Sequence, residues 1–349
     1  MSQAFNHILT PLANRIEVAN ESYLYFGGTA YLGIPQHKGF QELYIEGIRR
    51  FGLNNGTSRN NNVQLGIYKE AEMFGATYFG ANSCLITSSG YIAAQLSVKC
   101  LSAFGEVRYA PATHPALWIN ESPQTTGNFD SWAKELLTEI NQSKANTWVI
   151  ISNSLNNLHP AVYDFSFIEE IDQQKKIFLI VDDSHGIGLI NDGKGVFPTL
   201  PKLKNVETIV VASMAKALGV DAGLVLGSNA VISLLKQTNE FLGASPPSAA
   251  GLYAFMSAST IYKQALVQVK ALTGHLSAVL KEDKSWSFTQ DFPVFLSAKP
   301  AIAEQLLKKR ILMSSFAYPT KNGDLINRIV LCSWHTLADI EELILALAK

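Results

Sequence analysis

The stretch Thr208-Ile-Val-Val-Ala-Ser-Met-Ala-Lys-Ala-Leu-Gly219 carries an ionisable side chain just beyond a run of apolar residues. Residues Thr208–Ala212 are predicted to form a buried strand, and Lys216 comes shortly after its end. A lysine there is costly to bury unless it pairs with a carboxylate or takes part in covalent chemistry. A solvated lysine at the start of a surface helix is the plain alternative, so the rest of the chain has to decide.

Similar apolar runs recur along the chain and alternate with helical segments. They are continuous rather than alternating, as expected of strands in a sheet that is covered on both faces. This order predicts an α/β fold with a doubly wound, mostly parallel sheet, whose carboxyl strand ends meet at one ligand-binding edge. The predicted strands are Ser83–Thr87, Val107–Ala110, Trp148–Ser152, Ile177–Val181, Thr208–Ala212 and Leu224–Leu226, with helices at Phe40–Phe51, Ile67–Phe74, Ser131–Ile140 and Phe165–Ile171.

The pattern changes near Gly243-Ala-Ser-Pro-Pro247. We therefore predict a large domain over residues 36–243 and a smaller α+β C-terminal domain over residues 244–349, preceded by an N-terminal arm over residues 1–35 with short extended pieces. The C-terminal elements expected are one long helix over Ser248–Leu280, strands at Pro293–Leu296, Ile311–Ser314 and Ile329–Cys332, and a helix at Leu337–Leu347.

Composition excludes several classes of protein. With 349 residues, 47% of them apolar and 16% charged, the chain is typical of a compact globule. Its net charge of −1 gives no sign of nucleic-acid binding, and no apolar run is long enough to span a membrane. Cys84, Cys100 and Cys332 are too few and too widely spaced for a disulfide framework. Without signal-peptide features at the N-terminus, we expect a cytoplasmic enzyme.

A second strand end carries the group that Lys216 needs. Ile177-Phe-Leu-Ile-Val-Asp-Asp-Ser-His185 runs straight from a buried strand into two carboxylates and a histidine. Asp182 and Lys216 are separated by about one βαβ unit, so both can lie at the same sheet edge. A buried Asp182 needs a cation, and the protonated pyridine nitrogen of pyridoxal phosphate (PLP) would supply one, with Lys216 holding the cofactor as a Schiff base. For Asp182 alone, a helix cap, an ion pair or a metal ligand stays open.

Donors for the PLP phosphate are predicted where the strand Ser83–Thr87 turns into a helix. Ser89, Gly90 and Tyr91 lie at this turn, where free backbone N–H groups and the helix dipole favour an anion. Ser213 adds a hydroxyl close to Lys216. An ordinary helix cap is the alternative for Ser89.

His114 follows another predicted strand, and its ring is suited to stacking on the pyridine. No histidine spacing of the HxxxH or HExxH kind predicts a metal site. The segment Gly188–Gly195 nearly matches the phosphate-loop pattern GxxxxGK plus Ser or Thr, but Gly195 stands where the hydroxyl belongs. A GxSxG serine-hydrolase elbow is absent as well.

Taken in order, these parts resemble the α-oxoamine synthases, the 8-amino-7-oxononanoate synthase-like branch of the fold-type I PLP-dependent enzymes. The resemblance runs from about Tyr23 to the C-terminus. The segments that match family motifs are Tyr31–Gly33, Gly56–Arg59, Ser88–Tyr91, His114, Asp182–Gly188, Ser213–Gly219 and Arg328–Thr336.

The resemblance implies a role for each of these side chains. Lys216 would hold the cofactor and act as the base, Asp182 would pair with the pyridine nitrogen, and His114 would stack on the ring. His185 would lie on the side of the phenolic oxygen, and Arg328 would bind the carboxylate of the amino-acid substrate. The implied protein is a homodimeric, PLP-dependent C-acyltransferase that condenses an amino acid with an acyl-CoA thioester.

The sequence also departs from the family. Ala30 precedes Tyr31 where the family has Asn, and Ser152–Pro160 differs from the family segment that supplies a hydroxyl, which leaves the role of Ser154 open. These departures concern the substrate side of the site rather than the residues that match the PLP motifs. An aminotransferase or lyase on the same fold, or a PLP-binding protein without activity, stays an alternative.

Overall fold

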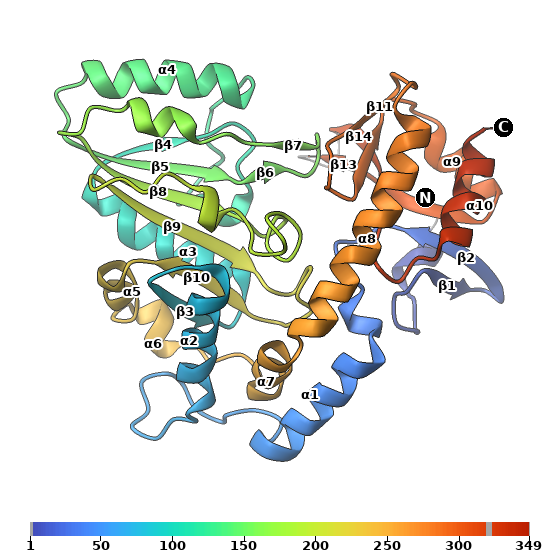
Figure 1. The fold of residues 1–349 in the computed structure, drawn as a ribbon, viewed down its shortest axis with the longest axis horizontal. Coiled ribbons are helices and arrows are strands. Elements are labelled where there is room, and N and C mark those ends of the chain that lie inside the picture. Colours follow the sequence, from blue (N-terminus) through green and yellow to red (C-terminus); the bar gives the residue numbers. More distant parts are fainter. Residues whose placement is uncertain (1–2, 319–322, 349) are drawn as a thin grey trace.

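The computed structural model describes residues 3–318 and 323–348, and the strands of this part form two six-stranded sheets and a short hairpin (Figure 1). The first sheet has the order β3-β10-β9-β8-β5-β4. Its strands are β3 (Ser83–Thr87), β4 (Glu106–Tyr109), β5 (Thr147–Asn153), β8 (Lys176–Asp182), β9 (Val206–Ser213) and β10 (Gly223–Gly227). The neighbours β4, β5, β8 and β9 are parallel, whereas β10 is antiparallel to β9 and β3. The mostly parallel sheet predicted from the sequence is confirmed.

Both faces of this sheet are buried, as its continuous apolar strands predict. Along β8, Ile177, Leu179 and Val181 belong to one hydrophobic core, and Phe178 and Ile180 to the other. The first core is shared with α1 (Lys38–Phe51), α2 (Ile67–Phe79) and α4 (Phe129–Gln142), and the second with α3 (Gly90–Leu101), α5 (Asn229–Leu235) and α6 (Asn239–Gly243). Packing on both sides fixes the direction of the side chains at the end of β8.

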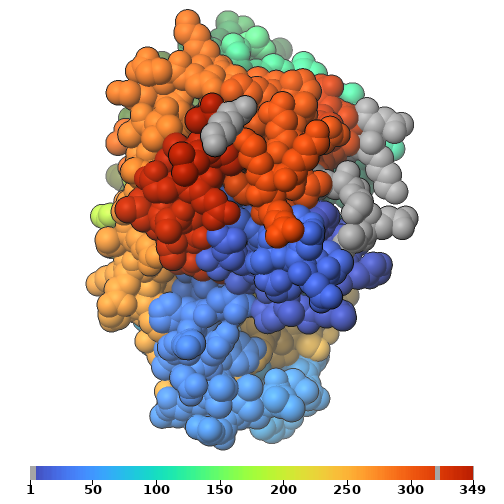
Figure 2. Space-filling view, turned by 90° about the vertical axis from the view of Figure 1, so that its right-hand side faces the viewer, coloured from blue at the N-terminus to red at the C-terminus, as the bar shows by residue number. Residues whose placement is uncertain are grey.

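The second sheet joins the two ends of the chain. Its order is β1-β2-β13-β14-β12-β11, and β2 pairs in parallel with β13. In Figure 2 the dark blue N-terminal segment lies against the red and orange C-terminal elements. The short extended pieces expected in the N-terminal arm are thus strands of this sheet, while the domain boundaries stay a prediction. Its strands are β1 (Arg15–Val18), β2 (Glu21–Phe26), β11 (Trp286–Phe288), β12 (Val294–Ser297), β13 (Ile311–Tyr318) and β14 (Asp324–Val330).

The hairpin of β6 (Leu155–Asn156) and β7 (Ala161–Val162) extends from the first sheet toward β13 and β14 (Figure 1). The remaining helices are α7 (Ala249–Ser257), α8 (Ser259–Leu280), α9 (Ile302–Lys308) and α10 (Leu337–Leu347). Among the described residues, no helix has both the length and the apolar character needed to cross a membrane.

Two predicted helices differ from the structure. The single helix expected over Ser248–Leu280 is broken at Ala258, whose N–H bonds to Phe255 in a tighter turn. Alanine favours helices, so tertiary packing rather than local propensity sets this break. The helix expected over Phe165–Ile171 is a 3₁₀ turn at Ser166–Glu170, which is too short to form a stable α-helix.

Candidate active site

A pocket of about 220 Å³ opens at the carboxyl ends of the parallel strands. Pairing between β5, β8 and β9 sets Asn153 beside Asp182 and Asp182 beside Val211, so the residues that follow these strands converge. The pocket is lined by side chains that the sequence singled out and by others it did not: His114, Asn153, Asp182, His185, Lys216 and Arg328, with Ala112, Leu155, Asn156, Asn157, Leu158, Phe316 and Tyr318. The sheet edge predicted to bind a ligand therefore carries a cavity.

Lys216 and His185 face each other in this pocket. The Nζ atom of Lys216 lies 2.9 Å from Nε2 of His185, and the hydroxyl of Tyr31 lies 2.7 Å from Nδ1 of the same ring. Burial lowers the pKa of Lys216 and lowers the pKa of His185 well below its usual value. A lysine with a lowered pKa and a neutral histidine are suited to proton transfer and to nucleophilic chemistry.

Asp182 and Asp183 are adjacent in sequence but have different surroundings. Asp182 faces the pocket, and its Oδ1 accepts the Ser184 N–H at 2.9 Å. The Ser184 hydroxyl in turn accepts the Ser213 N–H at 2.8 Å, which ties the Asp182 segment to the Lys216 segment. The carboxylate of Asp183 is enclosed in the protein, where burial raises its pKa to about 7. Only Asp182 is therefore available to a ligand.

His114 is held at the pocket by its own backbone and by Asn153. The Oδ1 atom of Asn153 accepts the His114 N–H at 3.1 Å, and its Nδ2 donates to the Ala112 carbonyl at 2.7 Å. Burial lowers the pKa of His114, so its ring is neutral and able to stack on an aromatic ligand.

The predicted phosphate turn lies beside the pocket rather than in its lining. Gly90 starts α3, and a Cβ at this position would come within 2.6 Å of Ser213 Cα, so the helix terminus packs directly on the end of β9. The Ser89 hydroxyl caps α3 by accepting the Ile92 N–H at 3.3 Å, while the Tyr91 ring is exposed. Ser89 thus caps the helix, and the use of the other amides of the first turn as donors for an anion stays a prediction.

Arg328 reaches the pocket from the second sheet. It lies on β14, is buried, and its Nη1 donates to the Asn157 carbonyl of the β6–β7 hairpin at 2.9 Å. Its guanidinium stands over the Phe316 ring at 5.2 Å, and burial lowers its pKa. Among the described residues, its Nε has no hydrogen-bond partner. A buried cation with unused donors that faces a cavity is suited to an anionic substrate.

Several contacts were not predicted from the sequence. Tyr31 was quoted only as part of a motif, and Asn153 and the β6–β7 hairpin were not assigned to the site. Ser154, whose role was open, is buried and is not among the residues that line the pocket; its N–H donates to the Asp182 carbonyl at 2.8 Å. Arg59, from the motif segment Gly56–Arg59, donates to the Ile86 carbonyl at 2.9 Å.

The residues present fit PLP. A carboxylate, a neutral histidine and an amine with a lowered pKa share one pocket, as a pyridine nitrogen, a phenolic oxygen and an aldehyde require. The absence of a side chain at Gly90 leaves the amides of α3 close to Ser213 and hence to Lys216. The side chains suited to the pyridine ring and the backbone amides suited to the phosphate are thus next to each other.

Comparisons with known proteins show the family of the chain. The model of the family "Aminotransferase class I and II" matches residues 53–347. A putative 8-amino-7-oxononanoate synthase of Thermodesulfovibrio yellowstonii is 23% identical over 343 residues, 94% of this chain and 88% of that protein. The 8-amino-7-oxononanoate synthase of Burkholderia mallei is 25% identical over 288 residues, 79% of this chain and 72% of that protein.

Solved structures have the same fold. A serine palmitoyltransferase from S. paucimobilis superposes with a TM-score of 0.84 at 15% identity and covers 99% of this chain and 92% of its own. The 8-amino-7-oxononanoate synthase of Francisella tularensis superposes with a TM-score of 0.73 at 16% identity and covers 93% and 97%. The fold-type I architecture expected from the sequence is confirmed.

Proposed function

The chain belongs to the aminotransferase class I and II family, and from that premise we propose that it condenses an amino acid with an acyl-CoA thioester. It is a PLP-dependent transferase, as the sequence predicts. The acyl-transfer reaction is supported by the likeness to 8-amino-7-oxononanoate synthases over most of the chain.

One observation carries the proposal. Lys216, His185 and Asp182 come from the ends of two adjacent parallel strands and share one pocket with Arg328 from the other sheet. Such a pocket has a nucleophilic amine on one side and a cation for a substrate carboxylate on the other. An amino acid bound by Arg328 would present its amino group toward Lys216.

The residues divide the work between binding and proton transfer. When bound, PLP supplies an electron sink that stabilises negative charge at the α carbon of the amino acid. Asp182 lies at the sheet edge as the negative partner for the pyridinium. Lys216, with its lowered pKa, takes the α proton in its neutral form, and the His185 ring lies 2.9 Å from its nitrogen. The His114 ring lines the pocket, where it would stack on the pyridine ring.

Arg328 orients the substrate by its carboxylate. Its fork of N–H groups matches a carboxylate in a bidentate manner. In the structure one of these groups donates to the Asn157 carbonyl, and Nε has no hydrogen-bond partner among the described residues, so the guanidinium keeps a donor for a carboxylate. The β6–β7 hairpin and Arg328 line the same pocket, so the hairpin would lie next to the bound amino acid.

Transamination is the second candidate, because the matching family model is that of class I and II aminotransferases. The two reactions give different products from the same first substrate. Transamination leaves a keto acid and aminated cofactor, whereas acyl transfer releases free CoA thiol.

The experiment is a screen of the PLP-loaded protein with single amino acids and acyl-CoA thioesters of increasing chain length. We expect thiol release that requires both substrates and PLP. Keto-acid formation without thiol release would favour transamination and contradict the proposal.

We further propose that the protein acts as a cytoplasmic homodimer. The apolar side chains of Leu53, Val63 and Met73 are exposed in the single chain, at the start of the large domain. Burial of such side chains stabilises association. Sedimentation at working concentrations should give twice the mass of 38.2 kDa.

A further inference from the structure

Tyr31 is the least expected residue next to the catalytic pair. Its side chain is fully buried, and its hydroxyl lies 2.7 Å from His185 Nδ1, across 154 residues of sequence. His185 is the only partner that this hydroxyl has within the described part of the chain. The Nζ atom of Lys216 lies 2.9 Å from Nε2, the other nitrogen of the same ring. The three side chains thus form a continuous hydrogen-bonded row.

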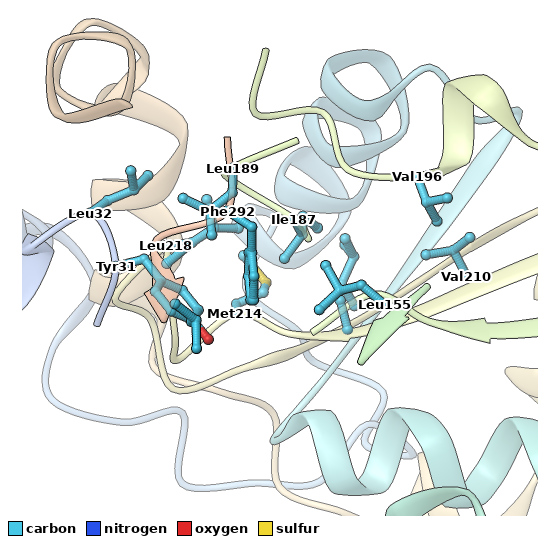
Figure 3. Packing of buried hydrophobic residues seen from close by; sticks show 14 of the residues in the cluster. Tyr31, Leu32, Leu155, Ile187, Leu189, Val196, Val210, Met214, Leu218 and Phe292 are labelled. Carbon is cyan, nitrogen blue, oxygen red and sulfur yellow. The ribbon is translucent and has the colours of Figure 1, made fainter. Parts of the chain in front are cut away.

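The surroundings hold Tyr31 in this position. Tyr31 belongs to the same buried hydrophobic cluster as Leu218 and Met214, which Figure 3 labels beside it, and its ring centroid lies 5.9 Å from that of Phe292. The Tyr31 carbonyl accepts the Ser333 N–H at 2.9 Å, which anchors the backbone to the segment that follows β14. Packing and backbone contacts therefore aim the hydroxyl at one acceptor.

The number of protons decides the direction of the hydrogen bonds. Burial raises the pKa of Tyr31 and lowers the pKa of His185, so both side chains are neutral. The Tyr31 hydroxyl then carries one proton, and the His185 ring carries one proton on either Nδ1 or Nε2. If Nδ1 of His185 carried the ring proton, the Tyr31 proton would have no acceptor in the described structure, which is costly for a buried hydroxyl. If Tyr31 donates to Nδ1, its proton has an acceptor, and Nε2 carries the ring proton and faces the nitrogen of Lys216.

We propose that Tyr31 is a positioning residue that holds His185 in the Nε2–H form, so that His185 presents a proton donor to the nitrogen of Lys216. An Nε2–H group can donate only to a nitrogen with a free lone pair. Tyr31 thereby favours the unprotonated form of Lys216, which is the form that attacks an aldehyde or accepts a proton. The inference rests on the proposed function only in that PLP binds at Lys216.

The test is a pH titration of the visible absorbance of the PLP-loaded protein and of its Tyr31→Phe variant. Without the hydroxyl, His185 is free to place its proton on Nδ1 and to accept from a protonated nitrogen on Lys216. We expect the midpoint of the titration to rise by about one pH unit, the value of one hydrogen bond. This titration does not require acyl-transfer activity. It therefore tests the role of Tyr31 even if the proposed reaction is wrong.

Tyr262→Phe is the matched control. Tyr262 is also buried, but its hydroxyl donates to the Leu218 carbonyl at 2.9 Å and does not touch His185. Its titration midpoint should stay at the wild-type value. In a His185→Gln background, Tyr31→Phe should cause no further shift, because Tyr31 acts through His185. A shift that is equal in the two tyrosine variants, or that persists without His185, would overturn the proposal.

A direct measurement covers the case in which Tyr31→Phe binds no PLP. The ¹⁵N NMR signals of His185 in the wild-type holoenzyme, identified by their loss in His185→Gln, report which ring nitrogen carries the proton. We expect a protonated Nε2 and an unprotonated Nδ1. A proton on Nδ1 would contradict the inference.

Discussion

The two walls of the pocket are built in different ways. The sheet wall, made of Asp182, His185 and Lys216, comes from the ends of β8 and β9, whose strands are packed on both faces. The hairpin wall, made of Leu155–Leu158 with Phe316, Tyr318 and Arg328, comes from the β6–β7 hairpin and from the second sheet. The first wall is part of a rigid core, and the second joins two separate elements.

This difference separates chemistry from specificity. Groups that hold a cofactor have to be fixed to within a fraction of an ångström, and a buried sheet edge provides that. Groups that select a substrate have to fit its shape, and a hairpin can change its side chains without disturbing a core. Changes in the sheet wall should therefore abolish the reaction, and changes in the hairpin wall should redirect or weaken it.

Lys216→Ala should have the largest effect. Removing both the nucleophile and the base should lower turnover by about a thousandfold or more, as measured by thiol release. Lys194→Ala is the matched control, because Lys194 is an exposed lysine from the segment that resembles a phosphate loop. Loss of activity in the control, or activity retained in Lys216→Ala, would show that the reaction does not depend on Lys216 in particular.

Arg328→Lys tests the hairpin wall. The change keeps the charge but removes the bidentate fork, so KM for the amino acid should rise roughly thirtyfold, equal to about 2 kcal/mol. The absorbance of bound PLP should be unchanged, because Arg328 does not belong to the sheet wall. Arg310→Lys, at an exposed arginine that pairs with Glu21, should have wild-type KM. A loss of PLP in Arg328→Lys would mean that the two walls are not separate.

Leu158→Ala should have a smaller effect on substrate choice. The change enlarges the hairpin wall, and preference between acyl chains should shift by about tenfold toward bulkier substrates, as expected for loss of a few methylene groups. Val162→Ala removes an exposed side chain of the same hairpin that does not line the pocket. Equal selectivity profiles for the two variants would show that the hairpin wall does not select the acyl chain.

Asp183→Asn should alter stability and leave the pocket unchanged. Burial raises the pKa of Asp183 to about 7, so the folded protein binds this proton more tightly than the unfolded chain. Stability contributed by the protonated group is therefore lost as pH rises from about 4 to about 7. The variant should melt a few degrees above wild type at pH 8, and this gain should shrink toward pH 5.

Asp192→Asn is the control for this pH dependence, because the Asp192 side chain is 94% exposed. Its melting temperature should follow the wild type at both pH values. A melting temperature of Asp183→Asn below that of wild type at pH 8 would show that the folded protein favours a carboxylate at this position, and that the pKa of Asp183 is not raised.

The sheet wall could be predicted from sequence, because each of its residues follows a continuous apolar strand directly. Strand type and order then decide where Asp182 and Lys216 lie, and the register between β8 and β9 agrees. The hairpin wall could not be predicted in this way. Leu155–Leu158 has no periodic pattern. Arg328 lies on β14 of the second sheet, and the way in which the two sheets are placed together has no signal in the sequence.

Long-range contacts and local breaks were also beyond sequence reasoning. Tyr31 meets His185 because β2 pairs with β13 and the following segment is anchored by Ser333. The antiparallel direction of β10 and the break at Ala258 depend on packing and not on residue type. Tertiary contacts of this kind have no local signal.

The most direct test of the account is to locate the lysine that carries PLP. The PLP-loaded protein is reduced with borohydride, digested, and its peptides are sequenced by mass spectrometry. We predict that the reduced cofactor is on Lys216 alone. A cofactor attached to a different lysine, or no attachment in a protein that shows a PLP absorbance band, would show that Lys216 does not hold the cofactor.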